Sequence, residues 1–110
     1  MSIEIHDNSK EVSEDIKYAL LRGMETCGLV AEGYAKKLAP VDTGNLRNSI
    51  THTVDDREPS AYIGTNVEYA PYQELGTIHM AAHPFLKPAV ADHANEYRKI
   101  IENELKNGLI

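Results

Sequence analysis

The first third of the chain carries apolar and polar positions with the period of a helix. Apolar residues recur at three- and four-residue steps over residues 12–38, as on one face of a long amphipathic helix. Pro40 disfavours helix at the position before it, so we expect the helix to end there. A second helical pattern begins at Pro84 and continues toward Gly108.

Between these helices the pattern has the two-residue period of strands. Residues 50–54 and 61–65 alternate in this way, and residues 55–60 between them are typical of a hairpin loop. Ile3 and Ile5 alternate with polar neighbours and indicate a short first strand. The chain is therefore predicted to be α+β, with two long helices packed on a small antiparallel sheet of about three to four strands.

Shorter elements connect these parts. Pro40 begins a turn that leads into one helical turn near Leu46. Residues 69–75 are expected to form a short helix that Gly76 stops, and residues 77–80 an extended stretch after it.

Three glycines interrupt the long helix, at a cost of about 1 kcal/mol each relative to alanine. Gly23 lies on the apolar face, where it permits close packing. Gly28 and Gly33 have no role that the pattern explains, beyond a bend or a subunit contact.

Length and composition indicate one folded domain over residues 1–110. Of the 110 residues, 42% are hydrophobic and 25% are charged, and this length supports one core but not two. Cys27 is the single cysteine, which excludes an internal disulfide and fits a reducing compartment; its place on the apolar helix face predicts a buried thiol. No apolar run is long enough to span a bilayer, and the first residues lack the pattern of a signal peptide.

The net charge is −6, and most of it lies in the middle of the chain. Residues 40–83 hold six acidic and two basic residues, which is −4 of the total. Asp55, Asp56 and Glu58 cluster in the hairpin loop, where they form either an ordinary solvated loop or a surface that repels DNA. A general nucleic-acid binder is disfavoured, because that function needs Lys and Arg gathered on one face.

Asp42-Thr43-Gly44 is the triplet of aspartic proteases. Their chemistry needs two such aspartates that face each other across a dimer axis and share one proton. The triplet normally follows an apolar strand, whereas here it follows a long helix and a proline. We therefore interpret it as a turn in which Asp42 or Thr43 caps a helix, with a small homodimeric protease as the alternative.

His79 and His83 lie four residues apart and would share one face of a helix, as metal ligands often do. However, Pro84 disfavours helix at His83, and no glutamate lies between the histidines as in zinc proteases. We expect no metal and no cofactor. The sequence also offers no catalytic triad and no phosphate-binding glycine loop.

Aromatic residues and prolines gather in residues 69–88. They form either a local core under the loops or a rigid patch that docks a neighbouring subunit, with Glu74 or Lys87 on its polar rim. The predicted subunit or partner interface consists of Tyr69, Pro71, Tyr72, Glu74, Gly76 and Phe85.

Three blocks of the sequence together resemble a known family. They are Pro-Val-Asp-Thr-Gly-Asn-Leu-Arg-Asn-Ser-Ile at 40–50, Ile-Gly-Thr-Asn-Val-Glu-Tyr-Ala-Pro-Tyr-Gln-Glu-Leu-Gly-Thr at 63–77, and His-Pro-Phe-Leu-Lys-Pro-Ala at 83–89. In this order they resemble the gene-product-ten-like family of tailed phages and prophages, which is named after a lambdoid phage of the HK series. The chain departs from the family at Leu75, where an aromatic residue is common, and in the loop 78–82.

The resemblance implies a non-enzymatic virion protein of the head–tail junction, of the neck, head-closure or tail-completion type, made in the host cytoplasm. It implies a ring of copies, often sixfold, that also contacts other head-closure, connector or tail proteins, and through which DNA passes without sequence-specific binding. No membrane is involved. The acidic loop would line the channel and let DNA slide. A ring needs two different patches on each copy, for which the hairpin 50–65 and the block 69–77 are the candidates.

Two other classes of protein stay open as alternatives. A protease would lose activity on Asp42→Asn, whereas ring assembly would persist. A toxin–antitoxin or regulatory binding module would need the basic face that the chain lacks.

Overall fold

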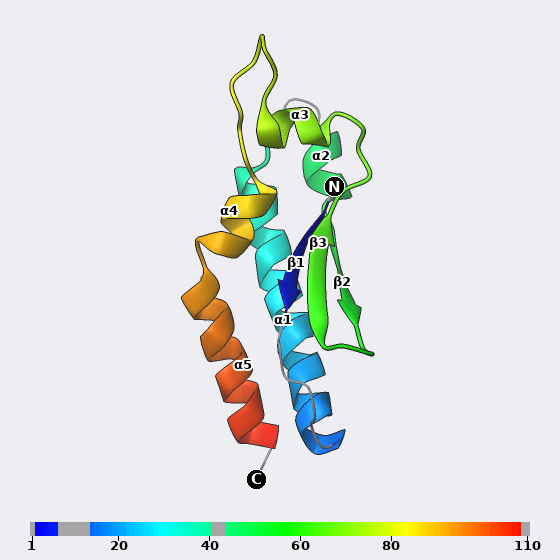
Figure 1. Cartoon of the computed structure of the whole chain (residues 1–110), viewed down its shortest axis with the longest axis vertical. Helices are drawn as coiled ribbons and strands as arrows, with labels where there is room; N and C mark the ends of the chain where they lie inside the picture. Colours follow the sequence, from blue (N-terminus) through cyan, green and yellow to red (C-terminus); the bar gives the residue numbers. More distant parts are fainter. Residues whose placement is uncertain (1, 7–13, 41–43, 109–110) are drawn as a thin grey trace.

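The computed structural model describes residues 2–6, 14–40 and 44–108. The molecule is elongated and measures 53 × 22 × 21 Å. Its long helix α1 runs along the long axis, between α5 on one side and the sheet on the other (Figure 1). The elements are β1 (Ser2–His6), α1 (Glu14–Leu38), α2 (Asn45–Ser49), β2 (Thr51–Asp55), β3 (Ser60–Gly64), α3 (Ala70–Leu75), α4 (Leu86–Ala91) and α5 (Ala94–Gly108).

The sheet is antiparallel throughout, in the order β1-β3-β2. β3 is the central strand, so Ile63 lies opposite Ile3 on one side and His52 on the other. The alternation predicted for β2 is confirmed, because Thr51 and Thr53 are exposed while His52 and Val54 are half-buried. Two long helices on a three-stranded sheet confirm the predicted α+β class.

The core lies between α1 and the sheet. The buried face of α1 consists mainly of small residues, among them Cys27, Ala31 and Ala35, which let the strands approach closely. Phe85 and Leu86, at the start of α4, close one end of this core. Cys27 is completely buried as predicted, and burial raises the pKa of its thiol to about 11, so it acts as a small apolar side chain.

Gly28 leaves space for a histidine of β2 that is hydrogen-bonded to two glutamates of α1. A Cβ at this position would lie 2.9 Å from Cδ2 of His52, whose ring covers the helix there. Nε2 of His52 lies 2.6 Å from Glu25 and Nδ1 lies 3.1 Å from Glu32, both on α1. Because both ring nitrogens face carboxylate oxygens, this geometry favours the form of His52 that carries a proton on each nitrogen. Burial lowers the pKa of His52, but the hydrogen bonds to both carboxylates outweigh it and raise the pKa above its ordinary value.

The other two helix glycines differ from Gly28. A Cβ at Gly23 would lie 3.4 Å from Cγ1 of Ile101, which places Gly23 in the contact between α1 and α5. A Cβ at Gly33 would meet nothing within 4 Å, so the space at Gly33 is open.

The prediction of one C-terminal helix from Pro84 onward is wrong. Two helices occupy the segment, and the first begins at Leu86. The break falls at Asp92 and His93, and both helices pack on α1. His93 stacks on Tyr34 of α1, with ring centroids 3.6 Å apart. Tyr97 holds the break from the other side, because its hydroxyl donates to the carbonyl of Ala89. These tertiary contacts override the continuous helical pattern.

Candidate functional site

A loop projects from the end of the molecule, between α3 and α4 (Figure 1). We call residues 76–84 the arm. Its tip is a tight reverse turn, because N–H of Thr77 donates to the carbonyl of Met80 at 2.8 Å and N–H of Met80 donates back at 3.3 Å. The extended stretch predicted for residues 77–80 is therefore wrong, since these residues pair with each other. The turn leaves Ile78 and His79 at the outermost point.

The base of the arm is fixed by backbone geometry. Gly76 ends α3 with φ of 78°, a conformation that residues with a Cβ rarely adopt. A Cβ there would also lie 2.8 Å from N of Ala82, on the returning side of the arm. N–H of His83 donates to the carbonyl of Gln73 at 2.7 Å. Both sides of the arm are thus tied to α3.

Glu74 locks the arm to α4. Its side chain is buried, and Oε1 accepts hydrogen bonds from N–H of Phe85 at 3.0 Å and of Leu86 at 2.8 Å. Oε2 accepts a third from N–H of Lys87 at 3.2 Å. These donors are the first N–H groups of α4, which have no partner inside the helix. One carboxylate therefore satisfies the start of α4 and holds α3 against it.

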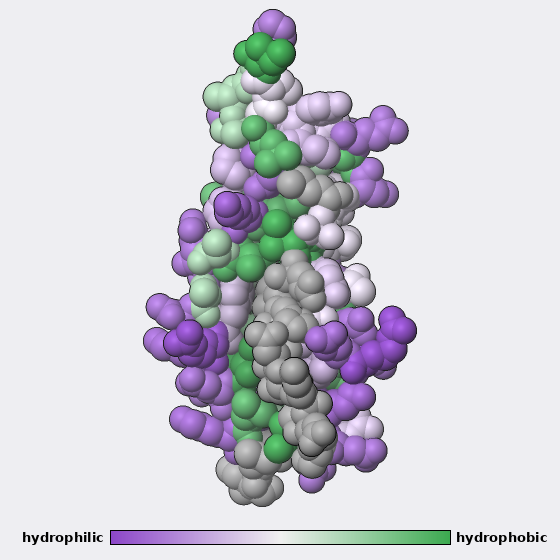
Figure 2. Space-filling view, in the orientation of Figure 1, coloured by the Kyte–Doolittle hydropathy of each residue, from purple (hydrophilic) through white to green (hydrophobic). Residues whose placement is uncertain are grey.

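Large apolar side chains are exposed along α3 and the arm. Figure 2 shows a hydrophobic side chain near the end of the molecule, directly below a hydrophilic one at the tip. The exposed fraction is 40% for Tyr69, 57% for Tyr72, 72% for Leu75 and 98% for Ile78. We call these four residues the apical patch. Gathered apolar exposure on a rigid support is typical of a surface that contacts another protein.

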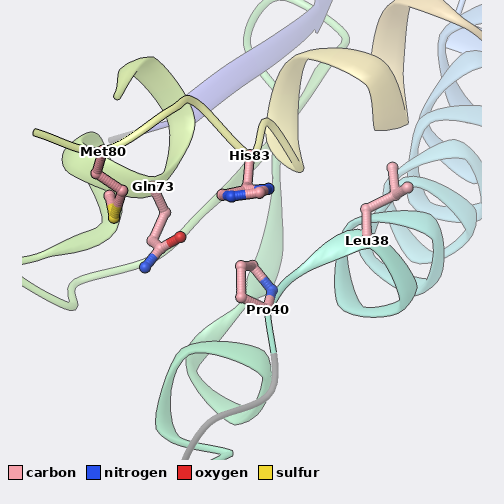
Figure 3. Close-up of a pocket in the computed structure, with 5 residues that line it drawn as sticks. All are labelled: Leu38, Pro40, Gln73, Met80 and His83. Atoms are coloured by element: carbon pink, nitrogen blue, oxygen red, sulfur yellow. The ribbon is translucent and has the colours of Figure 1, made fainter. Parts of the chain in front are cut away.

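A cleft lies beneath the arm, with a volume of about 400 Å³. Leu38 and Pro40 line it from the end of α1, and Gln73, Met80 and His83 line it from α3 and the arm (Figure 3). Of the described residues that line it, His83 is the one with a titratable side chain, so these residues supply no acid–base pair. Within residues 2–6, 14–40 and 44–108, no group of three His, Cys, Asp or Glu could hold a metal ion.

The six residues of the predicted interface are divided by the structure. Pro71 and Tyr72 are exposed on α3, and Tyr69 is exposed at the cap position before it. Gly76 is half-buried at the end of α3. Glu74 and Phe85 are buried within the chain itself, where they hold the arm and fill the core. The sequence interpretation missed Ile78, although an isolated apolar residue between Thr77 and His79, in a loop, is an available signal. The interface itself stays a prediction.

The acidic loop closes the hairpin of β2 and β3. Asp55 is paired within the loop, since its Oδ1 accepts from N–H of Arg57 at 3.0 Å and lies 3.7 Å from Nε of Arg57. Asp56 and Glu58 are exposed. In Figure 2 hydrophilic side chains project from this end of the hairpin.

The Asp42-Thr43-Gly44 turn is described only in part. Gly44 has φ of 80° and occupies the cap position of α2. The predicted cap at Asp42 or Thr43 lies outside the described residues.

A family model matches residues 3–76, which is more than half of the chain. The family is described as "Bacteriophage HK97-gp10, putative tail-component". The chain belongs to this family. The match runs from β1 through α3 to Gly76, so it includes three residues of the apical patch.

The family is one of phage tail components, so the chain is a structural protein of a phage virion. This membership gives no support to the protease alternative at Asp42. No curated protein and no solved structure matches the chain at a significant level. None of the helices in the described ranges has the length and apolarity to cross a membrane.

Proposed function

We propose that the chain is a non-enzymatic joint of the virion, a ring of copies at the head–tail junction that completes the neck or the tail. The apical patch carries this proposal. A tail component acts through contacts with other proteins. Tyr72, Leu75 and Ile78 present apolar surface that the fold of a single copy leaves exposed.

The arm suits docking because its order does not depend on a partner. Glu74 and Gly76 fix both ends of it in the free chain, so binding costs little conformational entropy. Its tip projects beyond the other elements and can reach a neighbour (Figure 1). A projecting tip that meets a different surface on the next copy gives the heterologous contact from which rings are built.

The acidic loop has two candidate places in such a ring. Asp55, Asp56 and Glu58 either face the channel, where they repel DNA, or lie in the contact between copies. The first assignment makes DNA the neighbour of the loop, and the second makes it another copy of the chain. The basic residues of the chain favour the contact between copies, because they attract the acidic loop.

The test is the mass of the purified full chain by light scattering across a concentration series. We expect the wild type to form a discrete multi-subunit species. Ile78→Ser should raise the midpoint concentration of assembly by roughly 10-fold or more, because burying an isoleucine contributes about 1.5–3 kcal/mol. The control is Leu29→Ser on α1, which removes an equally apolar side chain, 57% exposed, far from the arm.

A wild-type chain that stays monomeric at every concentration would contradict self-assembly. Equal midpoints for Ile78→Ser and the wild type would show that the arm is not the contact.

A further inference from the structure

Three basic side chains converge near the end of α1. Lys36 and Lys37 from the last turn of α1 and Arg47 from α2 line a hollow of about 210 Å³, which we call the basic pocket. Nε of Arg47 is buried, and no group of the described residues accepts a hydrogen bond from it. The protein as a whole is acidic, with a net charge of −6, so three cations around one hollow stand out from its surface.

Among the residues that the structure describes, the charge of the basic pocket is only partly balanced. Nζ of Lys36 lies 3.5 Å from Glu32, but Glu32 also contacts His52 and shares its charge between two cations. Nζ of Lys37 lies 5.9 Å from the centre of the Tyr34 ring, a weaker attraction than an ion pair. A buried guanidinium N–H without an acceptor is costly, and a carboxylate matches its geometry best.

An acidic segment lies elsewhere on the same molecule. The loop of Asp55, Asp56 and Glu58 carries three acids and one base, Arg57, for a charge of −2. β2 separates this loop from α2 and has five residues, so the loop lies roughly 16 Å from the start of the strand. Figure 1 shows the closed end of the hairpin pointing away from α2. The loop of one copy therefore cannot reach its own basic pocket.

We propose that the acidic loop of one copy docks in the basic pocket of the next, with Asp56 or Glu58 as the carboxylate that reaches Arg47 and Lys37. The occupant is a second copy because the charges of the two surfaces are complementary and the surfaces are separate. This contact rests on the self-assembly proposed above and adds an electrostatic component to it. It is heterologous, which a ring requires.

The test is charge reversal and its rescue, measured by light scattering on the full chain. Lys37→Glu and Asp56→Lys should each raise the midpoint concentration of assembly by about 10-fold, because each replaces attraction with repulsion. The double variant should return to within about 3-fold of the wild type, which also shows that the variants fold. Lys99→Glu, the same change at an exposed position of α5, should leave the midpoint unchanged.

Raised salt should weaken wild-type assembly and should weaken the single variants less. Wild-type midpoints in both single variants would overturn the proposal while leaving the ring intact. A double variant no better than the singles would also overturn it. A monomeric wild type would overturn this contact together with the ring.

Discussion

Among single residues, Glu74 has the largest part in shaping the projecting end. Its carboxylate accepts three backbone hydrogen bonds from the start of α4, from a position on α3 eleven to thirteen residues earlier. A buried carboxylate is tolerated only when such donors replace its hydration. The same residue therefore links two helices and fixes both ends of the arm.

Glu74→Gln should destabilise the chain by about 1–3 kcal/mol, because the amide keeps the shape but loses the charge that strengthens these hydrogen bonds. Chemical denaturation of the two proteins measures the difference. Glu102→Gln, an exposed change on α5, should alter stability by less than about 0.5 kcal/mol. A loss no larger for Glu74→Gln than for this control would exclude the proposed lock.

Residue roles at this end were only partly predictable. The sequence singled out residues 69–88, and Tyr69 and Tyr72 among them are exposed, whereas their role as an interface stays a prediction. It assigned Glu74 to a rim because charged residues are usually solvated. Burial of Glu74 depends on N–H groups that only the folded chain brings to it.

At the scale of elements, the contact between α1 and β2 depends on Gly28. His52 lies on the helix at this point and is held from both sides by Glu25 and Glu32. Since the ring is fixed by two hydrogen bonds, it cannot move aside without losing them. Gly33, one and a half turns later, faces open space.

Alanine at these two positions should have opposite effects. Gly33→Ala should stabilise the chain by up to about 1 kcal/mol, which is the helix propensity that glycine forfeits. In Gly28→Ala the same gain in helix propensity is outweighed, because the new Cβ displaces the His52 ring. We expect a net destabilisation of about 1–2 kcal/mol. Thermal and chemical unfolding measure both; equal stabilisation by the two substitutions would show that His52 is not fixed.

Most elements could be predicted because their periodicity is strong. The period of α1 and the alternation of β2 and β3 reflect burial on one face, which local sequence records. The break at His93 and the turn at residues 77–80 could not be predicted, because stacking on Tyr34 and pairing across the arm decide them. The reason for a glycine at position 28 could not be predicted either, because it depends on contact with His52, which is 24 positions later in the sequence.

The whole molecule is a narrow body with its notable surfaces well separated. The apical patch lies at one end, and the acidic loop lies at the closed end of the hairpin (Figure 1). Together with the family of tail components, this arrangement indicates a protein that acts by contact with neighbours. The central claim is that the conspicuous residues shape and join protomers.

The most direct measurement is electron microscopy of phage particles assembled with variant chains, counting heads joined to tails. Ile78→Asp should leave heads and tails unjoined, because it places a charge in the docking surface. Asp42→Asn should give joined particles in wild-type numbers, because the proposed role requires no reaction at that carboxylate. Unjoined particles with Asp42→Asn and normal ones with Ile78→Asp would contradict the account.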